Sequence, residues 1–121
     1  MARIYTSYFA NWRNFPEGSL KLGITRFPPD YWKDEINIAA LAPSVNLLRQ
    51  YKDKQVDEYV FAVQYKYQLR DRGLSPEGIR TILEEIAKGR DIVLCCYERP
   101  EEFCHRHILA EWLGEDVKEL E

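Results

Sequence analysis

Reactive side chains gather in one short segment of the sequence, residues 96–106. This segment holds two cysteines, a histidine, two arginines and three glutamates. Thiolates and carboxylates act as nucleophiles or exchange protons, and a neighbouring histidine can assist. We therefore predict a reaction centre in this segment, with Cys104, His105 and Glu98 as its candidate catalytic residues.

The same segment can also bind an anion. If a helix begins near Cys104, its free backbone N–H groups and its positive end favour negative charge. The same position lowers the pKa of a cysteine thiol from about 8.5 and favours the thiolate. We predict Arg106, Arg99 and Cys96 as substrate-binding residues, together with Arg26 if the N-terminal loop approaches.

Each of these residues also has a purely structural interpretation. Glu98 can cap the following helix or pair with Arg106. Cys104 can pack beneath the start of the helix, and His105 can fix the loop through a hydrogen bond. At least one of Cys95 and Cys96 is expected to be a plain core residue, because they point to opposite faces of a strand.

A zinc site built from Cys96, Cys104 and His105 is a third possibility. The spacing of the two cysteines matches no common zinc knuckle, and the paired Cys-x-x-Cys motif is missing. We therefore predict no metal and leave any cofactor unknown. A phosphatase-like loop is disfavoured as well, because the residue six positions beyond Cys96 is Glu102, which would repel a phosphate.

The elements around this segment indicate how it is positioned. The strand expected at residues 91–96 is apolar at every position after Asp91, which is typical of a central parallel strand buried on both faces. A helix is expected from about Cys104 to Gly114. Ligands of open α/β sheets bind beyond the carboxyl ends of the strands, which is where the reactive segment lies.

The rest of the chain predicts an α/β fold, a layered sheet with a central parallel strand and flanking helices, in one domain over residues 1–121. Pro43 suits the first turn of a helix running through Leu48. A second helix is indicated by an apolar stripe at helical spacing, although residues 59–65 also tolerate a strand. The stripe comprises Val56, Val60, Val63 and Tyr67. The other expected elements are strands at 3–9, 20–25 and 116–120, a loop at 10–19, and a helix with Ser75 as cap and Gly89 as stop.

Composition narrows the class of protein. Hydrophobic residues make up 45% of the 121 residues and charged residues 31%, as in globular proteins. The net charge of −3 opposes broad binding of nucleic acid, although residues 1–33 carry five basic side chains against two acidic ones. No apolar run is long enough to cross a bilayer, and the N-terminus lacks a signal peptide, so we expect no membrane partner and a cytoplasmic location. Three clustered cysteines form a poor disulfide framework, which agrees with that compartment.

Aromatic residues accompany the basic side chains of the N-terminal part. Trp12, Tyr31 and Trp32 lie in expected loops near these basic residues. Together they can stack a base or a nucleotide. The interpretation we favour is that they close the edge of the core.

Residues 91–113 resemble the DUF488 family of uncharacterised proteins. The resemblance rests on the apolar strand that ends in Cys96-Tyr97-Glu98, on Cys104-His105-Arg106, and on the helix that contains Ala110-Glu111-Trp112-Leu113. The family signature has the form Leu-Cys-x-Glu, a spacer, Cys-His-Arg and a helix. This resemblance implies an α/β fold and a site, and it implies no reaction.

Two functions are compatible with these residues. The first is a small intracellular enzyme acting on a small anionic or nucleotide-like ligand, by thiol-based transfer or by carboxylate-assisted hydrolysis of a glycosidic bond. The second is a non-catalytic module that binds a nucleotide or a nucleic-acid end in the same site. A reactive Cys104 thiolate or a strongly perturbed Glu98 would favour the enzyme, and polar groups locked to the backbone would favour the module.

Overall fold

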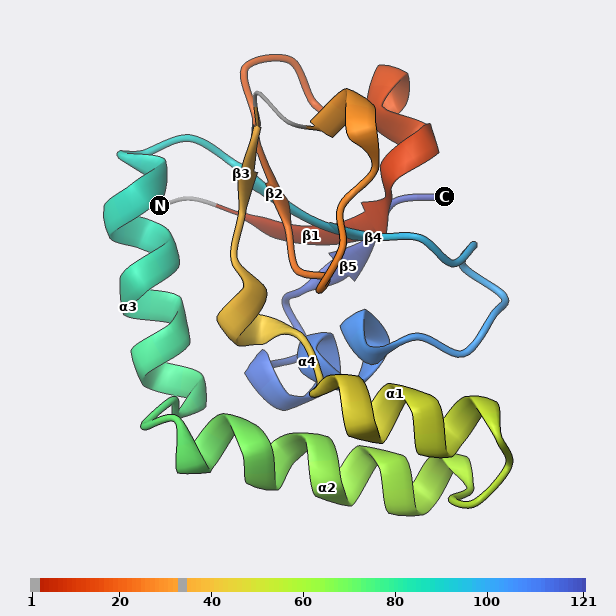
Figure 1. Cartoon of the computed structure of the whole chain (residues 1–121). Coiled ribbons are helices and arrows are strands. Elements are labelled where there is room, and N and C mark those ends of the chain that lie inside the picture. Colours follow the sequence, from red (N-terminus) through yellow and green to blue (C-terminus); the bar gives the residue numbers. More distant parts are fainter. Residues whose placement is uncertain (1–2, 33–34) are drawn as a thin grey trace.

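The computed structural model describes residues 3–32 and 35–121 and has an all-parallel sheet with helices against it (Figure 1). The sheet order is β3-β2-β4-β1-β5, so the strand expected to be central, β4, lies in the middle. The strands are β1 (Ile4–Tyr8), β2 (Leu20–Gly23), β3 (Ile36–Asn37), β4 (Ile92–Cys96) and β5 (Lys118–Glu119). The predicted α/β class is confirmed.

The strand β4 is buried at all five positions, as its unbroken apolar run predicts. It pairs with β1 from Ile4↔Ile92 to Tyr8↔Cys96 and with β2 on its other side. The carboxyl ends of these three strands therefore lie together at one edge of the sheet. This edge carries the reactive segment.

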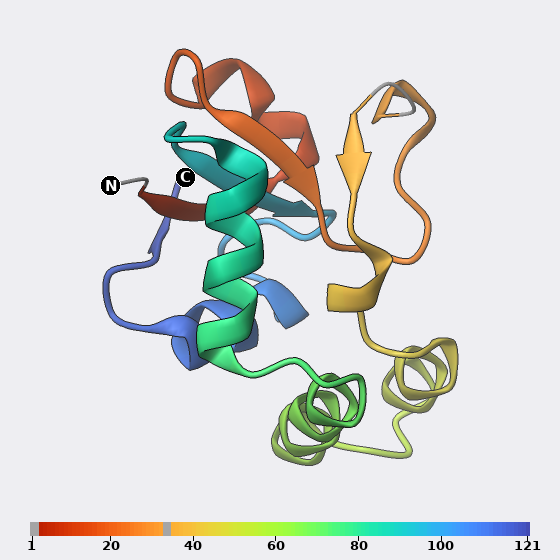
Figure 2. The same cartoon turned by 90° about the vertical axis from the view of Figure 1, so that its left-hand side faces the viewer.

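Four helices lie on one face of the sheet, and the opposite face carries short 3₁₀ segments and loops (Figures 1 and 2). The helices are α1 (Val45–Lys52), α2 (Glu58–Asp71), α3 (Pro76–Ala87) and α4 (His105–Leu113). The main core lies between these helices and the sheet. A smaller core of Phe9, Trp32, Val93 and Cys95 lies on the opposite face. Among the described residues, no helix combines the length and apolar character that crossing a bilayer requires.

Local sequence explains most of the helix boundaries. Ser75 accepts a hydrogen bond from the Gly78 N–H and Pro76 occupies the first turn of α3, as predicted. For α1 the cap is Ser44, so Pro43 precedes the helix instead of occupying its first turn. The first part of the expected loop at 10–19 lies in the 3₁₀ helix η1 (Phe9–Asn14), which also takes up the last residue of the expected strand at 3–9.

The helix that the apolar stripe indicated is formed as α2, but its buried face consists of other residues. The helix buries Phe61, Tyr65 and Leu69, whereas Val63 and Tyr67 are exposed. Both sets recur at helical spacing, so periodicity alone allows either face. The aromatic set is buried because Tyr65 donates a hydrogen bond to the Leu41 carbonyl while its ring and that of Phe61 fill the core. The alternative strand at residues 59–65 is not formed.

Candidate functional site

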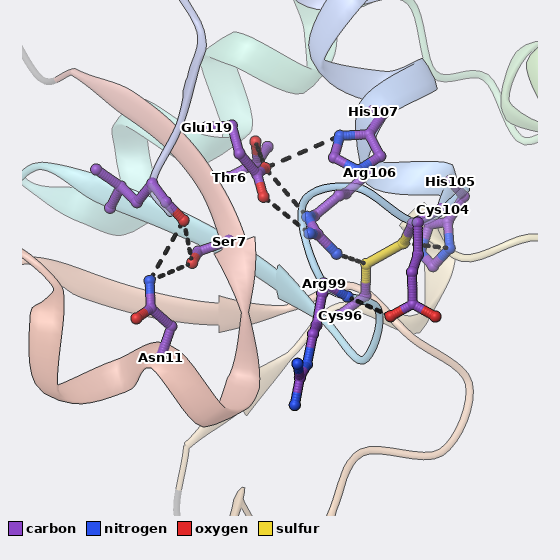
Figure 3. A network of polar contacts seen from close by, with 12 residues as sticks. Thr6, Ser7, Asn11, Cys96, Arg99, Cys104, His105, Arg106, His107 and Glu119 are labelled. Carbon is purple, nitrogen blue, oxygen red and sulfur yellow. Dashed lines mark hydrogen bonds and ion pairs between the residues drawn. A yellow bond between two sulfur atoms is a disulfide. The ribbon is translucent and has the colours of Figure 1, made fainter.

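Two cysteines and a histidine meet where β4 ends and α4 begins (Figure 3). Cys96 is the last residue of β4, Cys104 is the N-cap of α4, and His105 is its first residue. Their two sulfur atoms and the nearest ring nitrogen all lie within 4.8 Å of one another. All three side chains are buried. The structure therefore brings the predicted candidate residues Cys104 and His105 together with Cys96.

Cys96 and Cys104 are joined by a disulfide. We did not expect this bond, because an odd, clustered set of cysteines is a poor framework for structural cross-links. The fold explains it: the strand end and the helix start approach each other although eight positions separate them. Cys95 is the free cysteine, and it points into the small core on the other face.

His105 is held in one orientation by the neighbouring strand. Its Nε2 lies 2.6 Å from the carbonyl oxygen of Ile24, which can only accept a hydrogen bond, so Nε2 carries the proton. The other nitrogen, Nδ1, is then unprotonated and lies 3.9 Å from the Cys104 sulfur. Burial lowers the pKa of His105 to about 4 and keeps the ring neutral at neutral pH. His105 can therefore make the predicted structural hydrogen bond through Nε2 and still direct Nδ1 toward Cys104 for the predicted chemical role.

Arg106 is buried and is bonded to other residues of the chain, and its substrate-binding role stays a prediction. Its side chain is fully buried, and Nε and Nη2 donate to the two carboxylate oxygens of Glu119 at 3.1 and 2.8 Å. Its Nη1 donates to the Cys96 sulfur at 3.2 Å. The partner is thus Glu119 of β5, and not Glu98 as the structural interpretation proposed. The guanidinium of Arg106 thus places a buried positive charge beside the Cys96 sulfur.

Glu119 is the residue that sequence reasoning missed. The Thr6 hydroxyl donates a 2.6 Å hydrogen bond to Glu119, and His107 Nδ1 lies 3.9 Å from the same carboxylate oxygen. His107 therefore faces this carboxylate. No local pattern marks Glu119, because only the pairing of β5 with β1 brings it to Arg106.

Glu98 lies half-buried just beyond the end of β4. Burial raises its pKa above the ordinary carboxyl value, although a hydrogen bond to its own backbone and the charge of Arg106 act in the opposite direction. A raised pKa suits a carboxyl group that donates a proton. Its environment is therefore compatible with its predicted acid/base role.

The two other predicted arginines lie apart from the sulfur atoms. Arg99 is exposed and lines an open hollow of about 410 Å³ at the carboxyl edge, together with Tyr8, Pro100, Glu101 and Glu121. Arg26 follows β2 and donates a hydrogen bond from Nε to the Pro43 carbonyl at 3.0 Å. Neither arginine makes a hydrogen bond to the buried centre among the residues that the structure describes.

The same three atoms also have the composition of a metal site. Cysteine and histidine are the ligands that zinc prefers. The disulfide occupies both sulfur atoms, so only the reduced protein can present two thiolates to an ion. The spacing argument against zinc did not anticipate this convergence, and the absence of metal stays a prediction.

The comparisons with known proteins identify the family. A sequence model described as the active DUF488-N3 subclade, DUF488-N3a, matches residues 4–117. The chain belongs to the DUF488 family. No curated protein and no solved structure matches this DUF488 chain. The match extends far beyond residues 91–113, on which the resemblance rested. It includes every strand except β5, which begins just after the matched region.

We expect this DUF488 protein to resist alkylation until it is reduced. Cys96 and Cys104 are bonded to each other, and burial raises the pKa of Cys95 to about 12. After mild reduction, iodoacetamide at neutral pH should label Cys104 before Cys95, because the start of α4 stabilises a thiolate. Peptide mass spectrometry over time measures the order of labelling. If Cys95 is labelled first, Cys104 is not the reactive thiol.

Proposed function

We propose that this protein is a small enzyme whose reactive group is the Cys96–Cys104 pair and whose substrate is anionic or nucleotide-like. The observation that carries the proposal is the convergence of two sulfur atoms and an unprotonated histidine nitrogen at the carboxyl end of the central strand. The match to a subclade described as active supports catalysis. Parallel α/β sheets place their ligands at this edge.

The reduced pair is the state in which a thiol can react. A dithiol reductant would supply two electrons and two protons to the disulfide and release both thiols. His105 Nδ1 would accept a hydrogen bond from the Cys104 thiol, and the N-terminus of α4 would stabilise the thiolate once the proton is lost. The buried guanidinium of Arg106 would stabilise negative charge on Cys96 in the same way.

The proposed reaction is thiol-based transfer. The Cys104 sulfur would form a bond to the electrophilic atom of the substrate as the bond to the leaving group breaks. Glu98, whose raised pKa favours its protonated form, would donate a proton to that leaving group. Arg99, exposed in the hollow beside Tyr8, would pair with the anionic part of the substrate.

A cytoplasmic location also belongs to the proposal. In a reducing compartment, a disulfide is usually transient and serves catalysis or redox sensing. A Cys96–Cys104 bond that opens and closes agrees with that location.

The second candidate function, a binding module without chemistry, has one observation in its favour. His105 is bonded to the backbone of Ile24, Arg106 is bonded to Glu119, and all three centre residues are buried. The open hollow at this edge is lined by Arg99 and Tyr8 and by none of the three. Such a module would bind a nucleotide or a nucleic-acid end through Arg99 alone.

Turnover by the reduced protein tests the proposal. The reduced and oxidised proteins are incubated with nucleotides, nucleosides and sugar phosphates, and products are followed by mass spectrometry. We expect product from the reduced protein only, none from Cys104→Ser, and a rate lowered about 10²- to 10⁴-fold by Glu98→Gln. Cys95→Ser is the matched control and should retain the rate, because Cys95 lies on the other face of β4.

The module predicts a different outcome. The reduced wild type and Cys104→Ser would then bind the same ligand with equal affinity, and neither would form a product. Arg99→Gln would weaken that binding. Elemental analysis of the reduced protein accompanies both measurements. One zinc per chain that is lost in Cys104→Ser would show that Cys104 is a metal ligand and not a nucleophile.

A further inference from the structure

A second hollow lies on the face of the sheet opposite the four helices. It measures about 460 Å³, within the range of roughly 300–1,000 Å³ that small-molecule sites occupy. Its walls come from η1, from β2, from the 3₁₀ segment η2 (Asp30–Trp32) and from the residue before β3. The lining residues are Ala10, Trp12, Arg13, Lys21, Tyr31, Trp32 and Glu35.

One aromatic wall of this hollow is fixed in place. Trp32 is 2% exposed, packs edge-on against Phe9 at a centroid distance of 4.7 Å, and donates its indole N–H to the Ile36 carbonyl. It lies against Gly23 of β2, where a Cβ atom would come within 3.1 Å of the indole nitrogen and would clash with Asn37. The glycine thus allows the indole to approach the strand closely. The interpretation of Trp32 as the edge of a core is confirmed.

The two other aromatic side chains are open to solvent. Trp12 is 42% exposed and Tyr31 is 60% exposed, although both line the hollow. Tyr31 and Trp32 form a T-shaped pair with their ring centroids 6.4 Å apart, and most of the Tyr31 side chain remains open to solvent. Exposed aromatic rings around a concave surface are typical of recognition sites, because each ring offers a flat apolar face at a low cost in side-chain entropy. A flat aromatic ligand fits this arrangement.

Positive charge surrounds the same rings. The Arg13 guanidinium carbon lies 4.6 Å from the centroid of the Trp12 ring, and Lys21 Nζ lies 5.6 Å from the Trp12 ring and 5.8 Å from the Trp32 ring. Glu35 pairs with Lys21 at 3.3 Å and offsets one of the two charges. Among the described lining residues, the arginine on Trp12 therefore retains a charge that a ligand anion can pair with.

We infer that this hollow binds a nucleobase that carries a phosphate. The base stacks on Trp12 and Tyr31, and the phosphate pairs with Arg13, with Lys21 beside it. Aromatic stacking combined with a cationic rim is the general way in which proteins hold unpaired bases. The source of the base is either a free mononucleotide or the end of a single strand. The inference goes beyond the proposed function, because the hollow lies across the sheet from Cys96 and requires no reaction.

Tryptophan resonances test this site with an internal control. The chain has three tryptophans, and Trp112 lies on α4, away from this hollow. In ¹⁵N-labelled protein titrated with adenosine monophosphate, the indole N–H signals of Trp12 and Trp32 should shift and that of Trp112 should not. Adenosine and inorganic phosphate, titrated separately, should each bind at least tenfold more weakly than the nucleotide.

Variants and a second probe complete the experiment. Trp12→Ala and Arg13→Gln should each weaken binding about tenfold, the loss expected for one stacked base or one charged contact. Tyr59→Ala, an exposed aromatic on α2, should leave the affinity unchanged. A single-stranded oligo-dA that binds more than tenfold more tightly than adenosine monophosphate identifies a strand end, and equal binding identifies a free nucleotide. Cys104→Ser should retain binding, which separates this site from the proposed reaction.

Two results would overturn the inference. One is that neither probe shifts the Trp12 and Trp32 signals at millimolar concentration in a folded protein. The other is that Trp12→Ala binds the nucleotide as well as the wild type does.

Discussion

Arg106→Gln should lower the free energy of unfolding by about 3–5 kcal/mol, the typical cost of breaking a buried ion pair by removing one partner. The Arg106 side chain is fully buried and that of Glu119 is 20% exposed, so the carboxylate would lose its two guanidinium donors with little compensation from water. Glutamine is too short to replace both hydrogen bonds. Urea or thermal unfolding measures the loss, and a fall in melting temperature of about 10 °C or more is expected.

Two carboxylates of this chain provide a matched comparison. Glu119→Gln and Asp116→Asn make the same chemical change, and each residue pairs with an arginine. The Asp116 side chain is 68% exposed, so loss of its pair with Arg80 should cost little stability, because water screens surface ion pairs. Glu119→Gln should cost several times more. Equal losses in the two variants would show that the Arg106 pair contributes no more than a surface ion pair.

Acidification should destabilise the protein through His105, by about 3 kcal/mol from this group alone. In the unfolded chain the imidazole gains a proton near pH 6.5, whereas in the folded protein burial lowers its pKa to about 4. Between these pH values the unfolded state holds more protons, so stability falls as the pH falls from 6.5 to 4. Below about pH 4 this group contributes no further loss.

His105→Gln isolates this contribution, because the glutamine amide can still donate to the Ile24 carbonyl without titrating. The difference in unfolding free energy between wild type and variant should change by about 3 kcal/mol between pH 7 and pH 4. His107→Gln is the control, since the His107 side chain is 32% exposed and should account for less of the slope. A wild type and a His105→Gln variant with parallel pH profiles would mean that the pKa of His105 is the same in the folded and unfolded states.

The fold was predictable where one local pattern allows one structure. The apolar run at 92–96 has no amphipathic alternative, so its central place in the sheet followed from composition. Ser75 and Pro76 likewise define one helix start. Strand β3 was not predicted, because it has only two residues and its hydrogen bonds to β2 carry no sequence signal.

The approach of Cys96, Cys104 and His105 to one another was predictable from the sequence, and the other contacts of this segment were not. Cys96, Cys104 and His105 follow from a strand end and a helix start that the sequence indicates. The partner of Arg106 could not be predicted from the sequence. It lies in β5, which pairs with β1 although the two strands are far apart in the sequence, and no local pattern indicates that pairing. Contacts between residues from distant segments can be predicted only when the order of the strands in the sheet is known.

The position of β1 between β4 and β5 has a consequence for the speed of folding. β1 pairs with residues 92–96, and the Ser7 hydroxyl donates to the Leu120 carbonyl across a separation of 113 residues. Chains that rely on such distant contacts fold slowly, because the entropy of closing a long loop is lost before the contact forms. During synthesis, the hydrogen-bonding groups of β1 have no strand partner until residues 92–96 have left the ribosome. For that interval β1 is an unpaired strand open to other chains, so newly made protein should depend on chaperones more than a helical protein of the same length does.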